Sequence, residues 1–268
     1  MAIQKRNDEA VNLSGADFQK RYESSFAWRT ACSMYQALTA ERGFWPMSAV
    51  SAAGAACDQS GNGRTLAYNG NPAYDFDGLA PYIRFDGVGD FLSRADEAGL
   101  DITGTEAYIA AGHRGLTVGG WFRPEDATVD DSLMSKWGAA GQRSWSLYTS
   151  GTVAGDPCGF IISDDGTAVS SVASTNGFTA NEWCFVVGRF NDALIGEELS
   201  IWVNDTQTTA ATARNAIFNS NAAFYIGSDA GAGALFTGRA SMCFLCAAAL
   251  ADATIWALYQ HTRALFKV

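Results

Sequence analysis

The sequence has little of what several functional classes need. It holds 18 lysines and arginines against 28 aspartates and glutamates, for a net charge of −10. Nucleic-acid-binding proteins carry basic patches that neutralise phosphates, so this balance argues against that class. No apolar run reaches the roughly 18 residues that a membrane-spanning helix needs. We therefore expect neither nucleic acid nor a membrane as a partner.

The first fifteen residues also lack the apolar stretch of a secretory signal peptide. We expect synthesis in a cytoplasm, where thiols stay reduced. Among six cysteines, Cys243 and Cys246 form one Cys-x-x-Cys pair, and no second pair has matching spacing. A structural zinc site needs four ligands, so we interpret the pair as small apolar core residues.

Nucleophile and phosphate-binding motifs are missing too. The two histidines, His113 and His261, do not adjoin a Gly-x-Ser-x-Gly turn. The stretch DQSGNGRT, residues 58–65, has neither the lysine nor the spacing of a phosphate-binding loop. Its Asp, Ser, Asn and Gly residues instead predict a compact turn.

What is present predicts a β-rich fold. From residue 45 onward, about ten short apolar runs alternate with Gly, Asn, Asp and Ser clusters. Within residues 115–126, Leu116, Val118 and Phe122 share one face of a predicted strand, and Trp121 lies on the other. Trp202 alternates in the same way within residues 198–205. Strands of this kind indicate a two-sheet sandwich or barrel.

Helical spacing occurs at both ends of the chain. The pattern predicts a helix from a cap at Ser14 to about Arg42, stopped by Gly43, and a C-terminal helix capped by Asp252. The first helix has apolar residues on more than one side, so it packs on its own domain alone or also on another subunit. We take its aromatic residues as candidate docking residues: Phe18, Tyr22, Phe26, Trp28 and Tyr35.

An ordered set of phrases resembles a known family. FWPMSAV, DQSGNGRTL, YIRFDGVGDFLS, LTVGGWFRPED, LSIWVND and FYIGSD together resemble laminin-G-like domains of the concanavalin A-like lectin and glucanase superfamily. The resemblance covers roughly residues 44–266. The helical leader and the missing signal peptide resemble the versions that bacteriophage particles carry.

The resemblance implies an all-β, two-sheet antiparallel jelly-roll sandwich over residues 44–268, with residues 1–43 as an N-terminal arm and helix. In this family the turn at Asp58 can help hold a structural calcium. The acid that often follows the glycine matching Gly238 is absent here, so a turn alone and a turn with calcium both stay open. The alternating carboxylates of the glucanase branch are absent as well. We therefore expect no catalytic residues, no enzyme activity and no cofactor other than this calcium.

Two functions follow from this interpretation. The first is a non-enzymatic virion protein, such as a capsid decoration, that is located on the particle. It would dock through its N-terminal segment to virion proteins such as a major capsid protein, as a homo-oligomer. The alternative is a carbohydrate-binding adhesin, with Trp121 and Trp202 as candidate glycan-binding residues unless they belong to the core.

Overall fold

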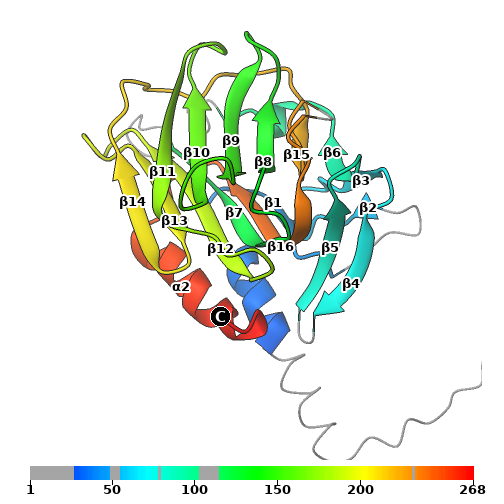
Figure 1. Ribbon diagram of the computed structural model, residues 1–268. Coiled ribbons are helices and arrows are strands. Elements are labelled where there is room, and N and C mark those ends of the chain that lie inside the picture. The colour runs from blue at the N-terminus through cyan, green and yellow to red at the C-terminus, as the bar shows by residue number, and fades with distance from the viewer. Residues whose placement is uncertain (1–26, 49–54, 78–79, 103–114, 231–232) are drawn as a thin grey trace, which may run out of the picture.

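The computed structural model describes residues 27–48, 55–77, 80–102, 115–230 and 233–268. Two antiparallel sheets pack face to face, and the helix α2 (Asp252–Thr262) lies beneath one of them (Figure 1). This arrangement confirms the predicted two-sheet sandwich with a C-terminal helix.

The first sheet, called sheet A here, has eight strands. They are β1 (Glu41–Trp45), β4 (Ala73–Asp77), β5 (Ala80–Asp86), β7 (Gly115–Pro124), β12 (Cys184–Asn191), β13 (Leu199–Val203), β14 (Thr206–Ala210) and β16 (Thr237–Cys246). Their order is β14-β13-β12-β7-β16-β5-β4, and β1 pairs with β16 off this path.

The second sheet, sheet B, also has eight strands. They are β2 (Ala55–Ala56), β3 (Leu66–Asn69), β6 (Phe91–Arg94), β8 (Asp130–Trp137), β9 (Arg143–Ser150), β10 (Pro157–Ser163), β11 (Val169–Gly177) and β15 (Phe224–Ile226). Their order is β11-β10-β9-β8-β15-β6-β3-β2. Short 3₁₀ turns complete the described elements, η1 (Ala98–Leu100) and η3 (Arg263–Leu265).

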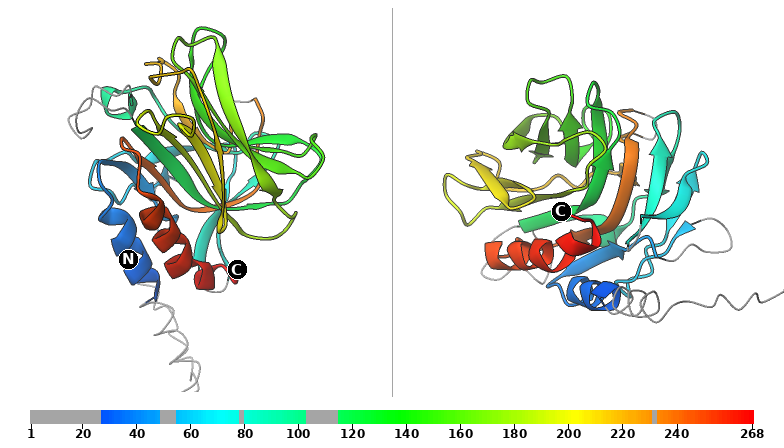
Figure 2. Two further views of the ribbon diagram at one scale, coloured as in Figure 1. Left: turned by 90° about the vertical axis from the view of Figure 1, so that its left-hand side faces the viewer. Right: turned by 60° about the horizontal axis from the view of Figure 1, so that its bottom comes forward.

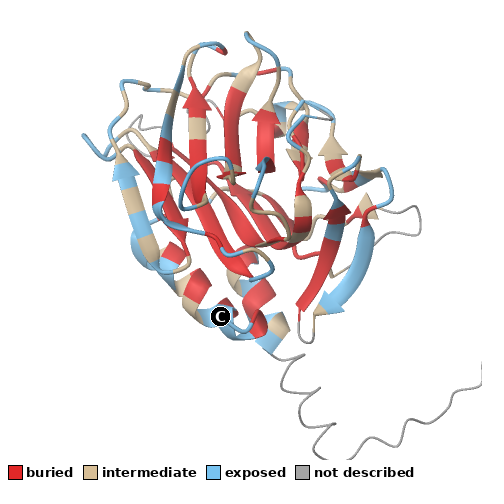
Figure 3. Cartoon of the chain, in the orientation of Figure 1, coloured by how far each residue is buried: buried red, intermediate tan, exposed pale blue. Residues whose placement is uncertain are grey.

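The main core lies between the sheets and follows the predicted alternation. Leu116, Val118 and Phe122 of β7 are fully buried there, and Leu147 and Phe160 of sheet B belong to the same cluster. Burying side chains of this size stabilises the fold by roughly 1.5–3 kcal/mol each. Burial is concentrated in the central strands, while β4 and β14 at the ends of sheet A are largely exposed (Figure 3).

A second hydrophobic layer covers the outer face of sheet A. Two helices lie side by side on this face, one formed by residues 27–36 and the other α2 (Figure 2). Tyr35 of the first helix stacks on Phe44 at 4.8 Å and meets Phe244 edge-on at 5.3 Å. Sheet A is therefore covered on both sides. No helix in the described part of the chain is long and apolar enough to cross a membrane.

The predicted ends of both helices need correction. The first helix stops at residue 36 instead of continuing to Arg42, and residues 41–45 form β1, with Gly43 opposite Leu245. Pairing with a distant strand and burial of Trp45 outweigh the helical pattern there. Asp252 does not cap α2, because the cap position is Ala251. Asp252 instead pairs with the buried Arg189.

Candidate functional site

The outer face of sheet B forms a groove floored by β8, β9 and β10. Ser132 of β8 stands opposite Tyr148 of β9, and Tyr148 stands opposite Gly159 of β10. One step along the same face, Ser146 stands opposite Ile161. A cavity of about 220 Å³ is lined by Ser132, Ser146, Tyr148 and Ile161. The small serine side chains keep the floor low.

An aromatic ring lies flat on this floor. A methyl group placed on Gly159 would come within 2.2 Å of Tyr148 Cζ, so the tyrosine ring occupies the space above the glycine backbone. Tyr148 is half-buried and lines the groove, so the ring's free face lies toward the groove. Any larger residue at position 159 would displace the ring. The sequence thus builds a flat apolar platform from a glycine and a tyrosine on neighbouring strands.

Trp137, at the end of β8, supplies a second aromatic ring to the groove. It is half-buried, and the guanidinium carbon of Arg143 lies 5.6 Å from the centre of its ring. A cation over the face of an indole is held by the ring's electron density. Tyr148 and Trp137 therefore provide two partly exposed apolar surfaces with serines between them.

Polar groups without a protein partner complete the groove. Ser132 is 2% exposed, and its Oγ atom makes no hydrogen bond within the described chain. A buried hydroxyl without a partner costs free energy, and a ligand recovers that cost only if the atoms that cover Ser132 move aside. Burial raises the pKa of Asp131, which also lines the groove, to about 6 and raises that of Asp229. Asp131 and Asp229 therefore hold their protons to a higher pH than exposed aspartates do.

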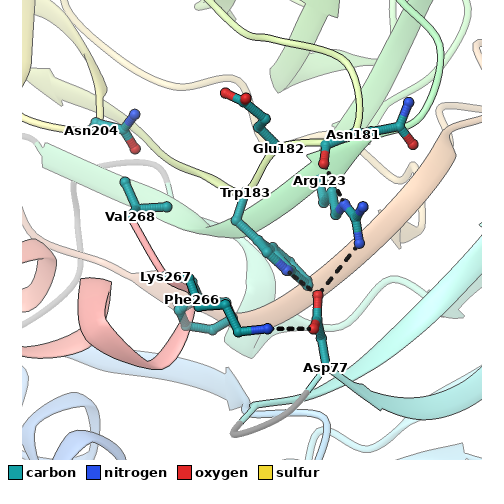
Figure 4. Close-up of a pocket in the computed structure, with 9 residues that line it drawn as sticks. All are labelled: Asp77, Arg123, Asn181, Glu182, Trp183, Asn204, Phe266, Lys267 and Val268. Atoms are coloured by element: carbon teal, nitrogen blue, oxygen red, sulfur yellow. Dashed lines mark hydrogen bonds and ion pairs between the residues drawn. The ribbon is translucent and has the colours of Figure 1, made fainter.

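A larger cavity of about 530 Å³ lies at one end of sheet A (Figure 4). It is centred on Asp77 at the end of β4. The Asp77 carboxylate accepts hydrogen bonds from Trp183 Nε1 at 3.2 Å, Lys267 Nζ at 3.2 Å and Arg123 Nη1 at 3.4 Å. Burial opposes the ionised form, but these hydrogen bonds and cations outweigh it and lower the pKa of Asp77. We call this cavity the Asp77 pocket.

The predicted glycan-binding tryptophans are not available to a sugar. Trp121 is fully buried, stacks on Phe266 at 4.3 Å and donates from Nε1 to Thr262 Oγ1 at 2.9 Å. Trp202 is 5% exposed, with the Arg189 guanidinium 4.6 Å from its ring centre. Both point away from the inner core, as the alternation predicts. They are covered because the helical layer lies on that face.

Asp58 organises the turn that follows it. Its carboxylate accepts hydrogen bonds from the backbone nitrogens of Phe44, Ser60 and Arg64 and from Ser60 Oγ, at 2.8–3.0 Å. The turn thereby fastens to β1. In the described ranges no group of three or more His, Cys, Asp or Glu residues is arranged to hold a metal ion. The structure supports the turn interpretation and adds nothing in favour of calcium.

Next to this turn, Glu41 leads to a prediction about pH. Burial, and then the charge of Asp58, raise the pKa of Glu41 from 4.5 to about 8. The folded state then holds a proton that the unfolded chain releases. The stability linked to this proton is full below pH 4.5 and is lost as the pH rises through about 8. We expect Glu41→Gln to raise the melting temperature at pH 8.5 and to leave it nearly unchanged at pH 4, as measured by differential scanning fluorimetry. An equal shift at both pH values would contradict the prediction.

The predicted docking residues divide into two groups. Phe18, Tyr22 and Phe26 lie outside the described residues. Tyr35 is fully buried against its own sheet, and Trp28 is partly buried against the same cluster. The described part of this helix therefore packs on its own domain, and Tyr35 is not free to dock elsewhere. Cys243 and Cys246 are free, buried thiols on opposite sides of sheet A, as expected for core residues.

The sequence interpretation missed the groove residues Trp137 and Tyr148. The segment SWSLYTS, residues 144–150, carried a usable signal. In it, Ser144, Ser146 and Tyr148 alternate with large apolar residues. A strand face made of serines and a tyrosine is too polar for a core. Recognising it as a site still requires knowing that no helix covers it.

Comparison with protein families gives one match, which spans residues 98–255 and so more than half of the chain. The matching family is a laminin-G group described as concanavalin A-like lectins and glucanases. The chain belongs to the concanavalin A-like lectin/glucanase superfamily. This membership confirms the family expected from the sequence phrases. A search of curated proteins gave no match.

Solved structures support the superfamily fold at low sequence identity. Domain 4 of the arabinanase AbnA from Geobacillus stearothermophilus, in complex with arabinotriose, is 14% identical with a TM-score of 0.56. That match covers 82% of this chain and 98% of the arabinanase domain. The ligand-binding domain of botulinum neurotoxin serotype D, in complex with N-acetylneuraminic acid, is 13% identical with a TM-score of 0.60. It covers 86% of this chain and 52% of the toxin domain.

The binding domain of Paraclostridial mosquitocidal protein 1 is 12% identical with a TM-score of 0.59, and the match covers 82% of this chain and 51% of that domain. The chain described here thus spans about half the length of the toxin domains that it matches. At these identities the likeness establishes the fold.

Proposed function

We propose that this protein is a carbohydrate-binding module that holds a glycan chain along the groove on sheet B. The observation that carries the proposal is the pair of partly exposed rings, Tyr148 and Trp137, that line one groove, with Ser146 between their levels on β9. Aromatic faces pack on the apolar faces of sugar rings, and buried hydroxyls pair with sugar hydroxyls. The sugars bound by two of the similar structures support the same class of ligand.

The charge of the groove favours a neutral glycan. Asp131 and Asp229 line it together with Asp130, whose pKa is lowered by hydrogen bonds from Thr152 and Ser150 despite an opposing effect of burial. The carboxyl groups of the three aspartates can pair with neutral hydroxyls, and those that are ionised repel an acidic sugar. We therefore propose a neutral oligosaccharide, bound without catalysis, as the ligand.

The direct test is retention on an array of neutral oligosaccharides that includes arabinotriose, followed by titration calorimetry on the best ligand. Tyr148→Ala and Trp137→Ala are each expected to weaken binding by about 10-fold to 100-fold, the equivalent of roughly 1.5–3 kcal/mol for a buried aromatic side chain. Tyr148→Phe keeps the ring and should bind nearly as wild type. Trp256→Ala, at a tryptophan 47% exposed on α2, is the matched control.

Circular dichroism on each variant separates loss of binding from loss of fold. The proposal fails if no glycan is retained, or if Tyr148→Ala and Trp137→Ala bind the retained glycan as tightly as wild type. New reducing ends released from the bound oligosaccharide would contradict the non-catalytic role.

The other expected function, a virion component, receives no support from the relatives described above, none of which is a virion protein. The candidate docking residue Tyr35 is also unavailable to a partner, because it packs on its own domain. Glycan binding is for this reason the function we put forward.

A further inference from the structure

The Asp77 pocket is separate from the groove. The groove lies on the outer face of sheet B, whereas the pocket is bounded by β4, β7, residues 181–183 and the C-terminal residues 266–268 at the side of sheet A (Figure 4). Its volume of about 530 Å³ falls within the usual range for small-molecule sites, roughly 300–1,000 Å³. Nothing in the groove depends on it.

The floor of the pocket is held in place before any ligand arrives. Asp77 is fixed by the donors from Trp183, Lys267 and Arg123 described above. The Trp183 ring in turn contacts the rings of Phe266 at 4.9 Å and Tyr82 at 6.1 Å. A floor whose side chains are already ordered loses little conformational entropy when a ligand binds.

The mouth of the pocket carries polar groups that the protein leaves unused. Asn181, Glu182 and Asn204 lie across the pocket from Asp77 and Lys267 (Figure 4). Within the described residues, the side chains of Asn181 and Glu182 make no hydrogen bond. Asn204 Oδ1 accepts from the Phe185 backbone nitrogen at 2.9 Å, which leaves its amide NH₂ group to donate. The mouth therefore offers both donors and acceptors.

The charges around the pocket cancel. Two carboxylates, Asp77 and Glu182, face two cations, Arg123 and Lys267, so neither an anionic nor a cationic ligand is favoured overall. Hydroxyl groups can use the amide donors and the carboxylate acceptors alike. We propose that the Asp77 pocket is a second binding site, which takes one or two units of a neutral sugar and works independently of the groove. Together the two sites would bind one glycan chain, or two neighbouring chains, bivalently.

The indole N–H of Trp183 provides a spectroscopic probe, because it sits on the pocket floor. We expect titration of ¹⁵N-labelled protein with neutral monosaccharides (glucose, galactose, arabinose, mannose and N-acetylglucosamine) to shift the Trp183 indole resonance with at least one of them. The double variant Asn181→Ala, Glu182→Ala removes two exposed groups and should weaken that binding at least threefold, since each hydrogen bond contributes modestly. Glu197→Ala, at an exposed loop position, is the control.

Two further titrations distinguish binding in the Asp77 pocket from binding in the groove. Tyr148→Ala should leave the Trp183 titration unchanged even where it abolishes binding in the groove. N-acetylneuraminic acid should bind the pocket no more tightly than the neutral sugars, because the charges that line it cancel. The proposal is overturned if no neutral sugar shifts the Trp183 resonance, if the double variant binds as wild type, or if the acidic sugar binds more tightly.

Discussion

Replacing Trp121 with alanine is expected to lower the free energy of unfolding by about 3–5 kcal/mol, the usual cost of removing a large buried aromatic side chain. Trp121 is fully buried between sheet A and the C-terminal residues. Its ring stacks on Phe266 and lies 6.0 Å from Tyr259 of α2, and its indole nitrogen bonds Thr262. The variant loses the surface on which the end of α2 rests.

Urea unfolding followed by circular dichroism measures this loss. Trp256→Ala is the matched control, because it removes the same side chain from an exposed position on α2 and should change stability by no more than about 0.5 kcal/mol. Trp121→Phe, which keeps an aromatic ring, should fall between the two. If Trp121→Ala keeps full stability but loses glycan binding, the ring is a sugar contact and its assignment to the core is wrong.

The second large effect is expected at Lys136, where substitution by methionine should cost about 3–5 kcal/mol. Lys136 is 1% exposed, and its ammonium group pairs with Asp96 at 2.6 Å and Asp101 at 3.1 Å. It also donates to the carbonyl oxygens of Ser220 and Ala222. Methionine fills similar space but leaves two carboxylates and two carbonyls without their cation.

The comparison with an exposed ion pair makes this prediction specific. Arg84→Met breaks the pair with Glu125, in which the arginine side chain is 50% exposed, and should cost less than about 1 kcal/mol. Adding Asp96→Asn and Asp101→Asn to Lys136→Met should recover part of the loss, because it removes the uncompensated charges. A Lys136→Met protein as stable as wild type in urea would show that the buried pair contributes nothing net.

Lys136 also matters for the proposed glycan site. It precedes Trp137 on β8, so it ties one end of the groove floor to the segments around Asp96 and Ser220. We interpret this buried cluster as the support that holds Trp137 in the groove that it lines together with Tyr148. The groove therefore depends on polar contacts between segments that are far apart in the sequence.

Sequence patterns predicted the elements whose periodicity reflects burial on one side. The alternation in β7 placed Leu116 and Val118 on one face and Trp121 on the other, and in the structure the first face meets the core between the sheets and the second meets the helices. Strands in which apolar and polar residues do not alternate clearly between the two faces were missed. β11 and β14 consist largely of Ser, Thr and Ala, and their pairing is set by neighbours in the sheet. The first two residues of β1, Glu41 and Arg42, were assigned to the end of a helix, because the partner strand β16 lies about 200 residues away and leaves no local signal.

The sequence by itself predicted a β-rich sandwich and the residues that share a strand face, because these follow from local periodicity and turn residues, and its ordered phrases carried the resemblance to the superfamily. Only the tertiary structure decided which outward face meets solvent. Two helices pack on sheet A and bury Trp121 and Trp202, whereas no helix in the described residues lies on the outer face of sheet B, where Tyr148 and Trp137 are partly exposed. Which face is covered depends on contacts between the ends of the chain and the middle of the sheet. Local sequence patterns do not predict contacts between segments so far apart.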